Sequence, residues 1–208
     1  LTEHIGAISG VSGGALLSTL YQYAPSTISD RTLLGPVIPP ERLTWESVTQ
    51  IHPQNLASPL LRLTDANILV GVLEEEEIML LTGHIGPDKL YARVLNRLFL
   101  EPFELHHTHK FVSLNQESVP SIVRRNPQLT DSSFYTTRAD RPFLIVGASQ
   151  VFPIGSNPTY RQFEFTPLYS GTPQFFAGQG AGGKDIGGGF IESFAFDAQR
   201  GGQPDAAD

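Results

Sequence analysis

The 208-residue chain contains no cysteine, so it can form neither disulfides nor thiolate-ligated zinc sites. A chain without thiols can occupy any redox compartment, so the lack of cysteine does not indicate a cellular location. Long hydrophobic runs are also missing. A long stretch without a charged residue, 142–160, is interrupted by Gly147, Pro153 and Gly155. It therefore cannot form the apolar helix of roughly 20 residues that a bilayer span requires.

Positive charge is scarce. Lysine and arginine number 14 against 21 aspartates and glutamates, which gives a net charge of -7. Nucleic-acid binding requires a local basic stripe, and the only dense basic pair is Arg124–Arg125. We therefore expect no nucleic-acid partner.

The chain begins at Leu1, not at methionine, and no basic segment followed by an apolar one suggests a signal peptide. Its length and its hydrophobic content of 40% suffice for one domain with a sizeable core. No composition shift marks a second domain. We expect residues 1–208 to form a single domain, incomplete at both ends, of a longer protein.

Hydrophobic periodicity predicts an α/β fold. A short strand is expected at 3–9, and the apolar residues of 15–23 then recur at helical spacing, so a tight turn lies between. Further helices are predicted at 45–51, at 68–81 and from Pro87 to 99, strands at 143–151 and 162–165, and loops at 24–40 and 177–189.

The turn between the first strand and the first helix has the spacing of a nucleophile elbow. Gly10, Ser12 and Gly14 fill the GxSxG pattern, in which a strained turn exposes the serine hydroxyl. The N–H of Gly13 then faces the oxyanion that forms during attack on an acyl group, and the helix N-terminus adds positive potential. Ser12 is the predicted nucleophile.

The segment "SGVSGGALLSTLY" resembles the nucleophile turn of the patatin and cytosolic phospholipase superfamily. A second segment, "FEFTPLYSG" at 163–171, is similar to the FEFTPYEFGS-type segment of lysophospholipases (phospholipase B), and it follows the strand "RPFLIVGAS" as it does there. "GGGFIESFAF" fits more loosely. The likeness departs at Leu168–Tyr169–Ser170, where the family carries Tyr-Glu-Phe, and it is poor in the helical middle.

The resemblance implies a three-layer α/β sandwich with a central sheet and a serine–aspartate dyad without histidine. It implies fatty acyl esters of phospholipids or lysophospholipids as substrates, an acyl-serine intermediate and transient contact with a membrane surface. It requires no metal and no cofactor for the dyad. A location in the cytoplasm or at the membrane periphery fits this family, while acyl-chain and headgroup preference are not readable from the sequence.

In that family the aspartate follows the FEFTP-like segment in an Asp-Gly-rich turn. The nearest candidate is Asp185 in "KDIGGG", where Ile186 separates it from the glycines, and its alternative role is to cap a turn. Asp197 is a second candidate. The family also places a glycine-rich oxyanion loop upstream of the serine, and only eleven residues precede Ser12 here. Because neither Asp185 nor Asp197 matches the family's Asp-Gly-rich turn, we expect the catalytic aspartate to lie beyond Asp208.

Two other interpretations stay open. Ser12, Asp88 and His109 follow the chain order of an α/β-hydrolase triad, although Asp88 at a helix start is also explained by the helix dipole. The second interpretation is a non-catalytic lipid-binding scaffold of the same fold, which has lost its catalytic base.

Four further features favour structural interpretations. The cluster His106, His107 and His109 lacks a carboxylate at ligand spacing and is typical of a solvated loop. Glu74–Glu77 and Arg124–Arg125 are predicted to be solvated. "QGAGGKDIGGG" matches no phosphate-binding spacing and is predicted to be a loop.

Overall fold

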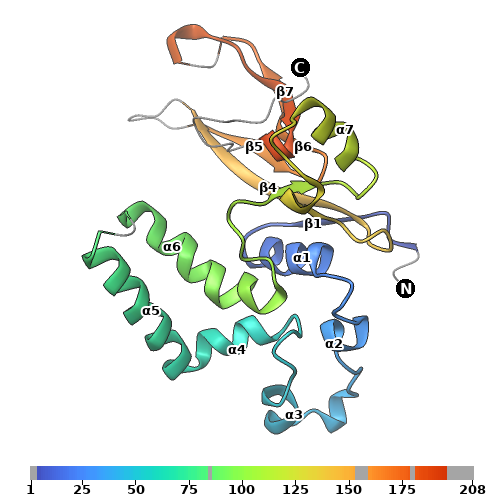
Figure 1. Cartoon of the computed structure of the whole chain (residues 1–208), viewed down its shortest axis with the longest axis vertical. Helices are drawn as coiled ribbons and strands as arrows, with labels where there is room; N and C mark the ends of the chain where they lie inside the picture. Colours follow the sequence, from blue (N-terminus) through green and yellow to red (C-terminus); the bar gives the residue numbers. More distant parts are fainter. Residues whose placement is uncertain (1–3, 84–85, 153–158, 179–180, 196–208) are drawn as a thin grey trace. The chain divides into compact units, whose positions relative to one another are not determined.

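The computed structural model describes residues 4–83, 86–152, 159–178 and 181–195. These form two compact units, a sheet unit (Leu1–Tyr23 with Thr108–Asp208) and a helical unit (Ala24–His107) inserted in its chain. Figure 1 shows their elements. Among the described residues, no helix combines the length and apolar character needed to cross a membrane. The expected α/β class is confirmed in general terms by a mixed sheet with helices.

The sheet unit is built on five strands in the order β1-β4-β5-β6-β7. Their bounds are β1 Ala7–Gly10, β4 Phe143–Phe152, β5 Thr159–Phe165, β6 Tyr169–Phe176 and β7 Ile186–Glu192. β1 and β4 are parallel, as a pair joined by a long connection can be, whereas the later strands follow one another as antiparallel neighbours. The strands predicted at 3–9, 143–151 and 162–165 are present; β6 and β7 were not predicted.

One face of this sheet can be identified from Gly10. A side chain added there would run into Ser18 and Gly14 of helix α1 (Gly13–Tyr23), so this face of β1 turns toward α1. Because directly paired residues share a face, the row Gly10–Val146–Phe165–Ser170–Ile191 follows. We call this side of the sheet the helix face. By alternation it also carries Ala148, Gln150, Phe163 and Thr172.

A smaller part of the sheet unit has its own core. Strands β2 (Phe111–Ser113) and β3 (Phe134–Thr136) pair in parallel, and helix α7 (Val119–Arg125) follows β2. Val119, Ile122, Phe134 and Phe194 form the buried cluster. Arg125 is not merely solvated as predicted, because its guanidinium donates to both carboxylate oxygens of Glu192 at 2.9 and 2.7 Å.

The helical unit consists of short elements around Leu33, Leu98 and Phe103, all of which are buried. The elements are α2 Asp30–Leu34, η2 Pro40–Arg42, α3 Trp45–Thr49, α4 Ser58–Thr64, α5 Ala66–Leu81, α6 Pro87–Leu95, the π-helical turn η3 Asn96–Leu100 and η4 Glu101–Phe103. Helices were predicted at the positions of α3, α5 and α6. The loop predicted for 24–40 was wrong in part, because the Ser29 hydroxyl accepts a hydrogen bond from the Thr32 N–H and starts α2.

The acidic run in α5 is only partly solvated, contrary to the prediction. Glu76 is completely buried, and Arg93 donates to its Oε2 at 2.6 Å from α6. Arg97, in the π-helical turn η3 that follows α6, forms an ion pair with Glu75 of α5. A buried carboxylate is stable only when it is paired, so this contact ties α5 to α6.

Replacing Glu76 with alanine should therefore lower the free energy of unfolding by about 2 kcal/mol, since a charged hydrogen bond is lost. Glu77→Ala is the matched control, because Glu77 is exposed on the same helix and should change stability by less than about 0.5 kcal/mol. Urea unfolding of the full chain, followed by circular dichroism, measures both. Equal losses in the two variants would contradict the assignment.

Candidate active site

Ser12 occupies a strained turn between a strand and a helix. β1 ends at Gly10 and α1 begins at Gly13, so only two residues make the reversal. Ser12 has φ +56°, a left-handed conformation that is uncommon outside glycine and costs about 1 kcal/mol or more. The residue is exposed to solvent. The GxSxG prediction of a bent, accessible serine at this position therefore agrees with the geometry.

The turn is held by a close approach between the strand end and the helix. A Cβ added at Gly10 would lie 2.7 Å from Ser18 Oγ and 2.8 Å from the Gly14 carbonyl oxygen. The Ser18 hydroxyl donates to that same carbonyl at 2.7 Å. On the neighbouring strand, a Cβ at Gly147 would lie 3.2 Å from Val11 Cγ2. The sequence analysis identified Gly10 but missed Ser18 and Gly147, because neither contact is local to the motif.

At the start of α1, some backbone N–H groups donate hydrogen bonds within the turn, whereas the Gly13 N–H, among the described residues, does not. The N–H of Gly14 donates to Val11 O at 3.1 Å and that of Ala15 to Ser12 O at 3.0 Å. Within the part of the chain that the structure describes, no backbone oxygen accepts the Gly13 N–H. This N–H follows the nucleophile directly, and it is the group that can donate to an oxyanion. The Gly14 N–H is already used within the turn, so Gly14 is not a donor to the oxyanion.

The structure does not bring Asp185 to Ser12. Asp185 directly precedes β7, and its Oδ1 accepts a hydrogen bond from the Gly178 N–H at 2.8 Å, which is the turn-capping role. β7 lies four strand spacings from β1, about 19 Å across the sheet. No carboxylate or imidazole among the described residues hydrogen-bonds to the Ser12 hydroxyl. Asp197 lies outside the described residues.

The residues of the alternative triad fall in different units. Asp88 lies in α6 of the helical unit, whereas His109 lies in the sheet unit, in the turn before β2.

The histidine cluster was also considered as a metal site. The centroids of the imidazole rings of His106 and His107 lie 4.2 Å apart. Among the described residues, no three histidine, aspartate or glutamate side chains are grouped to hold a metal ion.

The FEFTP segment forms the turn between β5 and β6. The Thr166 hydroxyl donates to Tyr169 O at 2.9 Å and accepts from the N–H groups of Leu168 and Tyr169. Ser193 joins it by donating to Thr166 O at 2.6 Å. In this chain the segment therefore has a structural role, which sequence reasoning had not assigned to it.

Comparisons with protein-family models, with curated proteins and with solved structures found no match to this chain. The functional interpretation therefore depends on the residues and their geometry.

Gly10→Ala should destabilise the fold by about 1–3 kcal/mol, because the new methyl group meets a backbone carbonyl and the Ser18 hydroxyl. Gly14→Ala is the control, since a Cβ there meets nothing within 4 Å. Thermal unfolding of the two full-length variants tests this prediction. A Gly10→Ala variant as stable as Gly14→Ala would show that the helix does not press on the strand end.

Proposed function

We propose that this chain is a serine acyl-hydrolase that cleaves fatty acyl esters of phospholipids or lysophospholipids. The observation that carries the proposal is Ser12 itself, an exposed hydroxyl at φ +56° on a two-residue turn between β1 and α1. Strained residues of this kind cluster at functional sites. The lipid ester as substrate, and the patatin-like three-layer sandwich as the complete fold, rest on the resemblance of the Ser12 and FEFTP segments.

The proposed reaction proceeds in two halves. Ser12 Oγ attacks the acyl carbon while its proton passes to a carboxylate base, and the oxyanion accepts a hydrogen bond from the Gly13 N–H. The alcohol leaves with that proton, and the acyl group stays on Ser12. Water then attacks the acyl-serine, gives its proton to the same carboxylate, and the fatty acid departs as Ser12 regains the proton.

The carboxylate base is part of the proposal. Asp185 accepts a hydrogen bond from the Gly178 N–H at the start of β7, four strands from β1 in the sheet order, and this supports a base other than Asp185. We propose that the base is a carboxylate other than Asp185.

A fluorophosphonate probe tests the nucleophile. The folded full-length protein should be labelled, and Ser12→Ala should reduce labelling to background, because the probe traps an activated serine. Ser9→Ala is the matched control, since Ser9 is also exposed and lies three residues away on β1. Absence of labelling in well-folded protein would favour the lipid-binding scaffold.

The base is tested by removing each rival proton acceptor. Asp185→Asn and the triple change of His106, His107 and His109 to alanine should each leave the labelling rate within about twofold of the parent protein. Loss of a general base typically costs about 100-fold or more. A loss of that size in the histidine variant would establish the triad instead, and in Asp185→Asn it would restore Asp185 to the dyad.

A further inference from the structure

Two adjoining cavities lie on the helix face of the sheet. One, of about 210 Å³, is lined by Ala148, Phe163 and Phe165 together with Ser149 and Gln150. The other, of about 250 Å³, includes Gln150, Phe163 and Thr172 among its lining residues. Gln150 and Phe163 line both cavities. We call the side chains Ala148, Gln150, Phe163, Phe165, Thr172 and Ile191 the trough.

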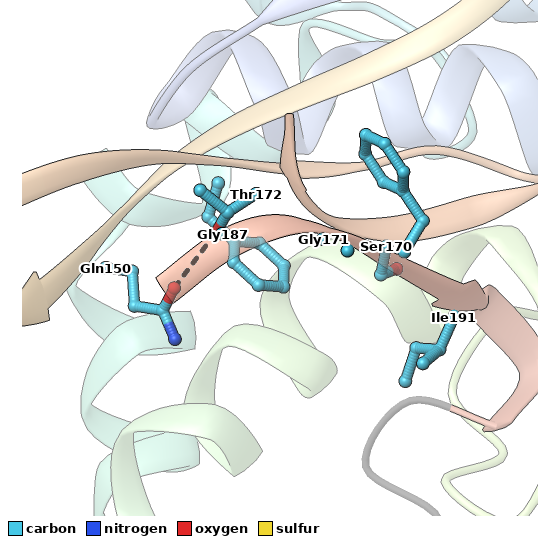
Figure 2. A pocket seen from close by; sticks show the side chains of 9 residues that line it. Gln150, Ser170, Gly171, Thr172, Gly187 and Ile191 are labelled. Atoms are coloured by element: carbon cyan, nitrogen blue, oxygen red, sulfur yellow. Dashed lines mark hydrogen bonds between the residues drawn. The ribbon is translucent and has the colours of Figure 1, made fainter. Parts of the chain in front are cut away.

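The sheet is concave at the trough. β5 lies between β4 and β6 in the sheet, yet Thr172 of β6 donates directly to Gln150 Oε1 of β4 at 2.9 Å. Figure 2 shows this bond at one end of the pocket and Ser170 and Ile191 at the other. Such a contact across an intervening strand requires the sheet to curl. Only Glu164↔Gly171 and Phe165↔Ser170 pair β5 with β6, so the two strands separate beyond them.

The lining suits an uncharged, apolar ligand. None of the described residues that line the two cavities carries a charge. Two of the hydroxyls present already have partners, because Thr172 bonds to Gln150 and the Ser170 hydroxyl bonds to that of Ser193 at 3.0 Å, whereas Ser149 is exposed to solvent. Phenyl rings and aliphatic groups supply much of the remaining wall. Burial of a hydrocarbon chain against Ser170 and Thr172 therefore leaves both of these hydroxyls hydrogen-bonded.

The trough begins at the level of the Ser12 turn. Gly10, two residues before Ser12, is in the same row as Val146, Phe165 and Ser170. β5 is two strand spacings from β1 and β6 is three, about 10 and 14 Å. A linear acyl chain whose carbonyl lies at Ser12 is long enough to span this distance.

We propose that the trough binds the hydrocarbon chain of the acyl group whose carbonyl Ser12 attacks. The ligand class is a straight-chain fatty acyl group, and the site extends from Phe165 toward Thr172 and Ile191. This inference rests on the proposed function for its connection to catalysis. The binding of a fatty acyl chain can be measured without catalysis.

The test measures binding of 11-(dansylamino)undecanoic acid by fluorescence, with the full-length protein carrying Ser12→Ala. Adding Ala148→Trp should weaken binding at least about tenfold, because the indole displaces two or more buried methylene groups. Ile191→Trp, at a position 40% exposed, should weaken it likewise and tolerates a larger side chain better. Gln162→Phe is the control, since Gln162 is exposed on the opposite face of β5.

The outcomes separate the two proposals. Failure of the probe to bind, or equal weakening by Gln162→Phe, overturns the trough whatever the labelling experiment shows. Selective weakening by either folded tryptophan variant supports it. Binding by the trough without fluorophosphonate labelling of Ser12 removes the hydrolase and leaves a fatty-acid-binding face. Labelling without binding removes the trough and leaves the hydrolase.

Discussion

The contact between the end of β1 and the first turn of α1 is the constraint on which the site depends. Gly10 has no side chain, so the Gly14 carbonyl and the Ser18 hydroxyl can approach its α-carbon. The chain must then reverse within Val11 and Ser12, and Ser12 takes the left-handed conformation. The helix is anchored at its other end, where the Arg141 guanidinium stacks on Tyr21 at 4.1 Å and donates to its hydroxyl. The strain at Ser12 is therefore maintained by packing on both ends of α1.

The same strand pairing that positions the turn also shapes the surface beside it. Gly10 is in register with Val146, and antiparallel pairing continues the row across β5 and β6 to β7. Curling of these strands turns a row of alternate side chains into a concave wall. Gly189, which pairs with Thr172, has no side chain that could fill the concave side of the sheet, and a Cβ there would meet nothing within 4 Å. The proposed nucleophile and the proposed trough thus depend on the same strand register.

Hydroxyl groups organise the hairpin that resembles the lysophospholipase segment. Thr166, Ser170 and Ser193 bond to one another's hydroxyl or carbonyl groups and are all buried. Buried hydroxyls require partners, so a serine or threonine lost here would leave a neighbour unsatisfied. The segment that resembles the lysophospholipase motif therefore contains Thr166 and Ser170 in positions where their hydroxyl groups stabilise the fold of this chain.

The sequence by itself determined the local features: the Ser12 turn, from the change of period around three glycines, the long helices α5 and α6, and the strands β1, β4 and β5. These follow from residue spacing and turn chemistry within a few positions. Only the tertiary structure decided that Glu76 is buried, that Asp185 caps the turn before β7, and that β6 and β7 join the sheet. Pairing between strands and between charges joins distant residues, and its energy depends on partners that local propensity does not encode.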